Sequence, residues 1–177
     1  MKVIQHTASR TTRGKNLTIV YGIHDFPVGN ILVALTAEGL CWLGINCDVA
    51  KLHENWKGAE LVEDKAATTK AAREIAKLWP DSLHKLSIPI VLYGTAFQLK
   101  VWKELLHIKS GSTVTYEHIA RKIGKPKAVR AVGSAVGRNT VSIVVPCHRV
   151  VNKSSDRINY GWGPAIKKAL LKGEKVA

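Results

Sequence analysis

The chain has 177 residues, 46% of them apolar, which is enough to bury one large hydrophobic core or two small ones. No apolar run approaches the ~20 residues of a membrane-spanning helix, and the polar, basic first 15 residues lack the hydrophobic segment of a secretory signal. Three cysteines are an odd number, which argues against a disulfide framework and favours the reducing cytoplasm.

The net charge of +14 is concentrated in the second half of the chain. Residues 1–90 hold 11 Lys/Arg and 9 Asp/Glu, whereas residues 91–177 hold 16 Lys/Arg and 4 Asp/Glu. A generally basic proteome would make both halves basic, yet the first half is close to neutral. The asymmetry therefore favours a polyanionic partner for the second half, most often nucleic acid.

The first half is predicted to be a small α/β domain over residues 1–90, of which 1–16 form a loose arm. Strands separated by turn signals are expected at residues 17–21, 29–34 and 39–45. A helix rich in Ala, Lys and Glu is expected over 63–79, where Pro80 ends it. Residues 86–92 are expected to be extended, because Ile88-Pro89 disfavours helix, and 86–93 are interpreted as the linker into a second domain.

The second half, residues 91–177, is predicted to be mainly helical, with N-caps at Thr95 and Thr115. Helices are expected at residues 96–107, 116–123, 127–137 and 165–172. A tight Gly-Lys-Pro turn at 124–126 joins the second and third of these, which is a helix-turn-helix pattern. The third helix has one apolar face, and its other side carries Lys127, Arg130, Ser134 and Arg138. In a strongly basic half, this face favours DNA contact over a merely solvated surface.

The segment Val145-Pro146-Cys147-His148-Arg149-Val150 places a thiol, an imidazole and a guanidinium on successive residues. A free thiol has a pKa of about 8.5, and a neighbouring His or Arg can lower it. Pro146 should end strand pairing just before Cys147, which places the sulfur at a strand end. Since successive strand residues face opposite ways, Cys147 and His148 cooperate only if the chain turns or a water bridges them. A buried structural cysteine is the alternative, and the residues around Cys147 favour a nucleophile.

The other candidate residues carry weaker signals. Cys41, Cys47 and His53 are six residues apart, wider than the pairs usual at zinc sites, so no metal site is predicted. The glycines at 161–163 lack the strand and spacing of a nucleotide cradle, and nothing in the sequence requires a cofactor. Glu174 follows a Lys-rich helix, and composition alone favours a solvated carboxylate there.

Much of the second half matches one family. The matching residues are Gly94-Thr95-Ala96-Phe97-Gln98, Val101-Trp102, Thr115-Tyr116, Ile119-Ala120, residues 123–133, Asn139 and Pro146-Cys147-His148-Arg149-Val150. They resemble the O6-alkylguanine-DNA alkyltransferases, also called methylated-DNA–protein-cysteine methyltransferases. The motif sequences are similar to those of the C-terminal part of bacterial Ada and its stand-alone relatives. The match covers residues 94–172 almost without gaps, and the first 90 residues match in layout. The resemblance implies a small α/β N-terminal domain of RNase H-like layout and a winged-helix second domain.

The resemblance also implies a reaction. The damaged guanine is flipped out through the minor groove, because O6 cannot be reached inside the stack. Cys147 then takes the methyl or alkyl group of O6-methylguanine, or more weakly of O4-methylthymine, in one irreversible, stoichiometric step. By analogy His148 accepts the thiol proton through a water, and Glu174 orients the imidazole. The partner is double-stranded DNA containing O6-alkylguanine, and the protein is expected to be a cytoplasmic, nucleoid-associated monomer without a membrane contact.

Further roles follow from the same resemblance. Tyr116 matches the tyrosine that rotates the target phosphate and donates toward guanine N3, Arg130 the arginine that fills the vacated stack, and Asn139 a structural asparagine. The other residues carried over as DNA contacts are Thr115, Lys127, Ala131, Gly133, Ser134 and Arg138. Those carried over to the substrate pocket are Val136, Pro146, Val150, Asn159, Tyr160 and Gly161.

Two departures from the family pattern and three competing functions accompany this reading. Thr140 stands where many relatives have Pro, which suggests a looser turn, and residues 154–159 lack the glycines that many relatives carry.

A non-catalytic lesion sensor would replace the nucleophile, which this chain keeps. A winged-helix regulator would need an effector or dimerisation element. A cysteine hydrolase usually has its Cys and His far apart in sequence.

Overall fold

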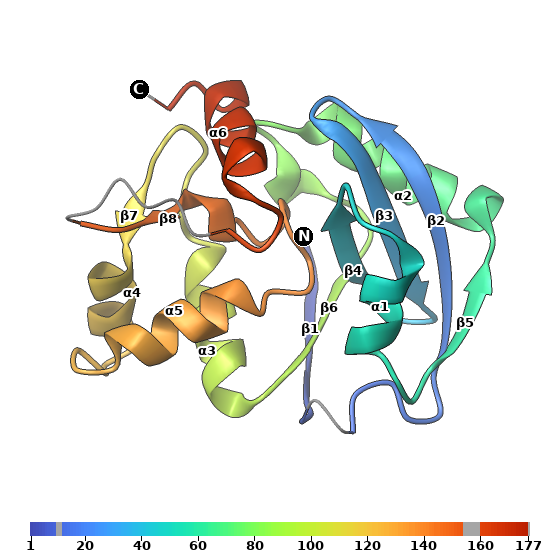
Figure 1. Ribbon diagram of the computed structural model, residues 1–177, viewed down its shortest axis with the longest axis horizontal. Helices are drawn as coiled ribbons and strands as arrows, with labels where there is room; N and C mark the ends of the chain where they lie inside the picture. The colour runs from blue at the N-terminus through green and yellow to red at the C-terminus, as the bar shows by residue number, and fades with distance from the viewer. Residues whose placement is uncertain (10–11, 154–159, 177) are drawn as a thin grey trace.

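A computed structural model describes residues 1–9, 12–153 and 160–176, and a six-stranded sheet forms the centre of its first half (Figure 1). The strands are β1 (Val3–Thr7), β2 (Thr18–Phe26), β3 (Gly29–Thr36), β4 (Gly39–Ile45), β5 (Glu60–Glu63) and β6 (Ile90–Gly94). Their order across the sheet is β1-β6-β4-β3-β2-β5. The meander β2-β3-β4 is antiparallel, whereas β1, β5 and β6 pair in parallel. This mixed sheet confirms the predicted α/β class.

The three predicted strands are confirmed, and β2 extends beyond its predicted end to Phe26. The tight turn between β3 and β4 depends on Gly39, whose φ of 144° is a conformation that side-chain-bearing residues rarely adopt. A Cβ at this position would also collide with the Pro89 carbonyl, so the turn requires glycine on both counts.

Two helices cover opposite faces of the sheet (Figure 1). Helix α1 (Val49–Asn55) is capped by Asp48, which accepts from the Lys51 N–H at 3.2 Å. Helix α2 (Lys65–Leu78) is capped in the same way by Asp64 and confirms the helix predicted over 63–79. It buries Ala71, Ala72 and Ile75 against the sheet, and a short 3-10 turn, η1 (Leu83–Lys85), follows it.

The sequence prediction was wrong for two segments of the first half and silent on two others. The arm expected at 1–16 contains β1, an edge strand that pairs with β6. The segment expected at 86–93 as an extended linker contains most of β6, so the extended conformation is confirmed there, but β6 is no linker: it is buried between β1 and β4. Helix α1 and strand β5 had no prediction. Short strands such as β1 and β6 gain their hydrogen bonds from partners far away in sequence, which a local pattern does not reveal.

The second half contains four helices in the described residues, arranged beside the sheet (Figure 1). They are α3 (Ala96–Leu105), α4 (Tyr116–Lys122), α5 (Val129–Gly137) and α6 (Pro164–Gly173). Both predicted N-caps are confirmed, since the side chain of Thr95 accepts from Gln98 N–H and that of Thr115 from His118 N–H. The parallel pair β7 (Val114–Thr115) and β8 (Val150–Val151) joins the start of α4 to the segment after Cys147. No helix in these described ranges is long and apolar enough to cross a bilayer.

One hydrophobic core runs through both halves of the molecule. It joins buried residues of the sheet, of α2 and of helices α3 to α6, among them Ile31, Leu43, Ile75, Trp102, Val132 and Leu170. Trp102 of α3 also donates its indole N–H to the Ala135 carbonyl of α5 at 2.8 Å. The division into domains at residues 90 and 91 stays a prediction. The shared core makes the position of the helical half dependent on the sheet.

Candidate active site around Cys147

Cys147 lies in a tight turn and not at the end of a strand. Only Val141 of the apolar run before Pro146 pairs with the sheet, through one parallel bridge to Leu43 of β4, so the strand expected there is wrong. Cys147 begins the 3-10 turn η2 (Cys147–Arg149). Ile143 has a φ of 69°, an uncommon conformation for a β-branched residue, and marks local strain in the bend that leads to the thiol.

The buried amide of Asn139 holds this turn together. Its Nδ2 donates to the carbonyls of Val141 and Val145 at 3.4 and 2.8 Å, and its Oδ1 accepts from the Val141 N–H at 3.1 Å. The same Nδ2 lies 3.1 Å from the Sγ of Cys147. The side chain thus spans the turn and reaches the thiol, which supports the structural role predicted for Asn139.

Strand β4 anchors the same turn to the sheet. The Leu43 N–H donates to the Thr140 carbonyl at 2.9 Å, and the Leu43 carbonyl accepts from the Ser142 N–H at 3.1 Å. Thr140 is buried, and its hydroxyl has no hydrogen-bond partner among the described residues. These backbone bonds run on both sides of Val141, so the first half of the chain helps to place the nucleophile.

The Cys147 thiol is buried and protonated at rest. Burial raises its pKa, and its hydrogen bonds with Asn139 and Tyr160 and the nearby charge of Lys167 offset only part of that effect. The expectation that the adjacent Arg lowers the thiol pKa is wrong, because the Arg149 guanidinium contacts Glu174 and the Ile108 carbonyl. A thiol held in this state needs a base at the moment of reaction.

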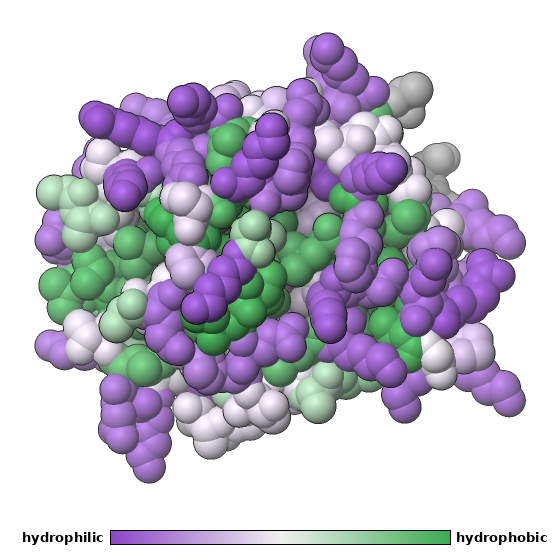
Figure 2. All heavy atoms as spheres, turned by 180° about the vertical axis from the view of Figure 1, so that it is seen from behind, coloured by the Kyte–Doolittle hydropathy of each residue, from purple (hydrophilic) through white to green (hydrophobic). Residues whose placement is uncertain are grey.

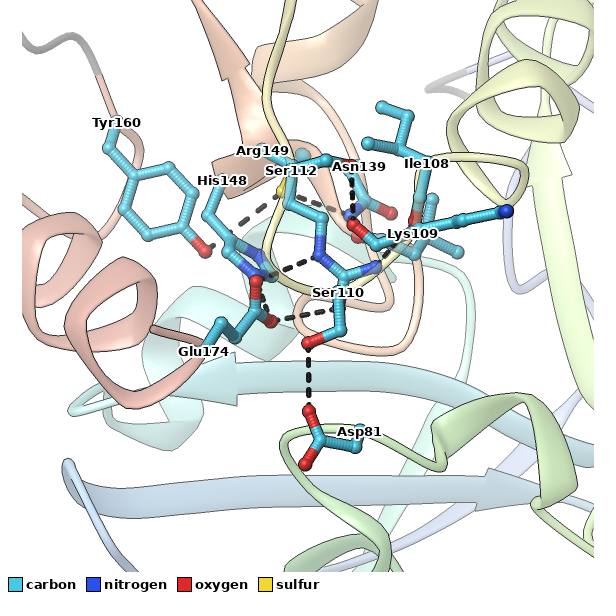
Figure 3. A network of polar contacts seen from close by, with 12 residues as sticks. Asp81, Ile108, Lys109, Ser110, Ser112, Asn139, His148, Arg149, Tyr160 and Glu174 are labelled. Carbon is cyan, nitrogen blue, oxygen red and sulfur yellow. Dashed lines mark hydrogen bonds and ion pairs between the residues drawn. The ribbon is translucent and has the colours of Figure 1, made fainter. Parts of the chain in front are cut away.

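His148, Arg149 and Glu174 form a buried relay next to the thiol (Figure 3). The Nε2 of His148 lies 2.8 Å from a carboxylate oxygen of Glu174. Arg149 donates from Nε and Nη2 to both oxygens of that carboxylate, at 2.9 and 2.8 Å. Glu174 is therefore no solvated carboxylate, because its side chain is fully buried between two partners.

The relay leaves one imidazole nitrogen available. Burial lowers the pKa of His148, and the hydrogen bond with Glu174 compensates in part, so the ring is neutral at rest. Burial alone would raise the pKa of Glu174, but hydrogen bonds and charge from His148 and Arg149 lower it overall. The Nδ1 of His148 is buried and has no partner among the described residues. A neutral imidazole oriented by a carboxylate can accept a proton at this nitrogen.

Acid is expected to destabilise the protein through both groups. Because the folded-state pKa of His148 lies below its usual ~6.5, the unfolded chain binds this proton first and stability falls as pH drops through that value. Glu174, whose pKa is also lowered, adds a second loss below its usual ~4.3. Each group contributes a slope of at most about 1.4 kcal/mol per pH unit. Urea unfolding at pH 8, 6, 4.5 and 3 measures both losses of stability, and His148→Gln should flatten the upper step.

A cleft of about 730 Å³ opens in front of the thiol, between the two halves. Its lining includes Cys147, Tyr116, which was predicted to be catalytic, Gly133, which was predicted to contact DNA, and the predicted pocket residues Val136, Tyr160 and Gly161. The phenol of Tyr160 lies 4.0 Å from the Sγ of Cys147. Among the other predicted pocket residues, Pro146 lines a separate hollow of about 200 Å³, Val150 is buried, and Asn159 lies outside the described residues.

The first half supplies one wall of this cleft. Trp162 donates from its indole to the Ser142 hydroxyl at 2.6 Å and meets the ring of Trp42 edge to face, with 6.0 Å between the centroids. Arg13 and Lys51 line the same cleft from the first half. The segment after residue 159 is thus fixed both to the turn before Cys147 and to β4.

Helix α5 presents a solvent-exposed face next to the cleft. Arg130, Ala131, Ser134 and Arg138 are exposed, as is Lys127 just before the helix, whereas Val132, Ala135 and Val136 are buried. On the face turned away from the view of Figure 1, hydrophilic side chains project over most of the surface, with apolar ones visible between them (Figure 2). An exposed basic helix beside a deep cleft is an arrangement that suits contact with DNA.

The sequence prediction missed two buried cations. Arg149 lies within the quoted motif but was considered only for an effect on the thiol pKa, and Lys167 was part of a helix interpreted only as Lys-rich. Lys167 is 4% exposed and donates to the Val150 carbonyl at 2.6 Å. Its position on α6 one turn from Leu170, on the apolar face of the helix, was the only signal available.

Both the sequence and the fold of this chain are similar to those of known proteins. The family described as "6-O-methylguanine DNA methyltransferase, DNA binding domain" matches residues 96–176. The inducible methylated-DNA–protein-cysteine methyltransferase of Bacillus subtilis is 38% identical over 165 residues, 90% of this chain and 92% of that protein. The bifunctional transcriptional activator/DNA repair enzyme Ada of Escherichia coli is 36% identical over 91% of this chain, which spans only 47% of Ada. Among solved structures, Mycobacterium tuberculosis OGT in complex with DNA superposes with a TM-score of 0.74 at 35% identity, covering 89% of this chain and 92% of that one.

Proposed function

Because the chain belongs to the methylated-DNA–protein-cysteine methyltransferase family, we propose that it repairs O6-methylguanine in double-stranded DNA by taking the methyl group onto Cys147. The observation that carries the proposal is a buried thiol beside the His148–Glu174–Arg149 relay, at the base of a cleft next to an exposed basic helix. O4-methylthymine is a weaker substrate of the same reaction.

The transfer is a single displacement at the methyl carbon. The bond between the Cys147 sulfur and the methyl carbon forms while the bond from that carbon to guanine O6 breaks. A water relays the thiol proton to Nδ1 of His148, the nitrogen without a protein partner, and Glu174 holds the ring through Nε2. Tyr116 donates toward guanine N3, so the proton lost by the thiol balances the one that guanine gains.

The reaction runs once per protein molecule. The product is a thioether, a poor leaving group, and no described residue of the cleft offers a route to remove the methyl group. The protein acts as a monomer on DNA in the cytoplasm, at the nucleoid. The base reaches the thiol by flipping, because a stacked guanine cannot bring O6 to a buried sulfur.

The test is the mass of the intact protein and of its peptides after mixing with a duplex that contains one O6-methylguanine. One added methyl group per molecule, on the peptide with Cys147 and saturating at one equivalent, supports stoichiometric repair. Tight binding without a change in mass would favour a lesion sensor. Continued turnover of substrate would favour a hydrolase.

Arg130→Ala is expected to slow methyl transfer at saturating DNA by about tenfold and to weaken duplex binding less than threefold. The exposed guanidinium at the start of α5 fills the space that the flipped base leaves, and unstacking a base costs a few kcal/mol. Single-turnover kinetics give the transfer rate, and 2-aminopurine fluorescence beside the lesion reports flipping.

Arg73→Ala is the matched control, because Arg73 is equally exposed but lies on α2, away from the cleft. Arg73→Ala should change neither the rate of methyl transfer nor the affinity for duplex DNA. If Arg130→Ala reduces binding and transfer by the same factor, Arg130 contributes only charge and has no role in the stack.

A further inference from the structure

The end of helix α6 carries the carboxylate on which the relay depends. Glu174 is the C-cap residue of this helix, and its N–H donates to the Leu170 carbonyl at 3.0 Å. Lys175 follows with a φ of 55°, and the Val176 N–H donates to the Leu171 carbonyl, which closes the helix with a Schellman motif. Helix ends fray easily when nothing packs on them, so the position of Glu174 depends on what covers this turn.

Trp79, a residue of the first half, covers it. A Cβ added at Gly173 would lie only 2.6 Å from Cζ2 of the Trp79 ring, so the indole lies directly on the backbone next to Glu174. Glycine is the residue that permits such a close approach. Outside the helix's own backbone and the adjacent residues, the three described atoms nearest to this added Cβ all belong to the Trp79 ring.

The Trp79 ring is itself held firmly on the sheet side. The backbone N–H of Trp79 donates to the Ile75 carbonyl of α2 at 3.0 Å, and the ring packs against that of Phe26 at 5.3 Å between centroids. The indole N–H is buried without a hydrogen-bond partner among the described residues. An unpaired polar group is unfavourable in a core, so packing is what this ring contributes.

Two further contacts hold the end of α6 near Glu174. Ser110 donates to the Asp81 carboxylate at 3.3 Å, which joins the corner after Trp79 to the loop after α3 (Figure 3). Gly111 of that loop, at a φ of 75°, lies so close to the Glu174 carbonyl that an added Cβ would be 3.4 Å from it. The end of α6 is thus held between the corner after α2 and the loop after α3.

We propose that Trp79 is a positioning residue of the methyl transfer reaction: it fixes the end of α6 and thereby holds Glu174 against His148. The inference rests on the proposed function and gives the α/β half a role in the chemistry. The charged groups that act on the imidazole are Glu174 and Lys167 from α6 and Arg149 from η2. Trp79 reaches the imidazole only through Glu174.

The test uses the rate at which iodoacetamide alkylates Cys147, measured by peptide mass from pH 6 to 10 without DNA. In this reaction the sulfur–carbon bond forms, iodide leaves and the thiol proton passes to the base or to solvent. Trp79→Ala should lower the rate at pH 7 at least tenfold and move the profile to higher pH, because a displaced Glu174 leaves His148 a weaker base. Trp79→Phe should restore the rate to within threefold.

Gly173→Ala tests the contact from the other side. Alone, it should displace the indole and lower the rate as Trp79→Ala does. In the Trp79→Ala background the space is empty, and Gly173→Ala should change the rate less than twofold. Additive losses in this cycle would overturn the proposal, since they would show that the two residues act independently.

Ile19→Ala controls for lost stability, because Ile19 is fully buried on the opposite face of the sheet. It should lower the melting temperature without moving the pH profile of Cys147. If Trp79→Ala keeps the wild-type pH profile of alkylation, Trp79 only stabilises the fold and the proposal is wrong. This holds even if the rate falls because a smaller fraction of the protein is folded. A wild-type protein that fails to take a methyl group from DNA would refute the proposed function, and the alkylation profile would still decide the role of Trp79.

Discussion

Cys147→Ala is expected to abolish methyl transfer and to leave binding to duplex DNA within about twofold of the wild type. The sulfur is the nucleophile, and the cleft offers no second thiol among its described lining residues. The turn should survive, because Asn139 still bonds the Val141 and Val145 carbonyls when the Sγ is removed. Protein mass after incubation with the lesion duplex measures transfer, and fluorescence anisotropy measures binding.

Cys47→Ala is the matched control for this result. Cys47 is half-buried in the first half of the chain, and burial raises its pKa to about 11, so it is a poor nucleophile. This variant should still accept one methyl group per molecule. Methyl transfer by Cys147→Ala would place the nucleophile elsewhere and remove the basis of the proposed function.

Glu174→Ala is expected to lower the free energy of unfolding by about 3–5 kcal/mol and to stop methyl transfer. Removing one partner of a buried ion pair leaves the other charge uncompensated, which is the costly case. In this variant the Arg149 guanidinium would keep only its hydrogen bond to the Ile108 carbonyl, and the His148 ring would lose its only described hydrogen-bond partner. Urea unfolding followed by tryptophan fluorescence measures the stability, and single-turnover kinetics at low temperature measure the transfer rate.

Glu104→Ala is the comparison for an accessible carboxylate. Glu104 pairs with the largely exposed His107 at 3.6 Å, and such surface pairs contribute about 0–1 kcal/mol. A loss for Glu174→Ala no larger than that for Glu104→Ala would mean that the buried relay adds no stability. Full transfer activity in Glu174→Ala would show that His148 needs no orienting carboxylate.

Prediction from sequence succeeded where the signal is local. The caps at Thr95 and Thr115 are confirmed because a side-chain oxygen and an N–H three residues on are enough to start a helix. The glycine-based β3–β4 hairpin and the Ala-rich α2 are confirmed for the same reason. The family, and with it the expectation of a reactive Cys147, was recognised from short motifs, and the match with solved relatives confirms the family.

Local signals failed where a partner lies far away in sequence. β1 and β6 are strands because each completes hydrogen bonds of the other, so a local pattern predicted only the extended conformation around 86–92 and not the pairing. The apolar run before Pro146 was expected to be a strand, but Asn139 and Leu43 bend it into a turn by satisfying its backbone groups. The geometry around Cys147 supports some of the roles predicted for the site residues, and the remaining roles stay predictions.

The sequence by itself determined the helices with their caps, the basic second half and the thiol, imidazole and guanidinium on successive residues. Only the tertiary structure decided the protonation states. Arg149 turns away from the thiol to Glu174, burial raises the thiol pKa, and a carboxylate from the last helix becomes the partner of His148. The physical reason is that desolvation and pairing depend on which groups meet inside the core, and that is set by contacts between distant segments such as Trp79 and Gly173.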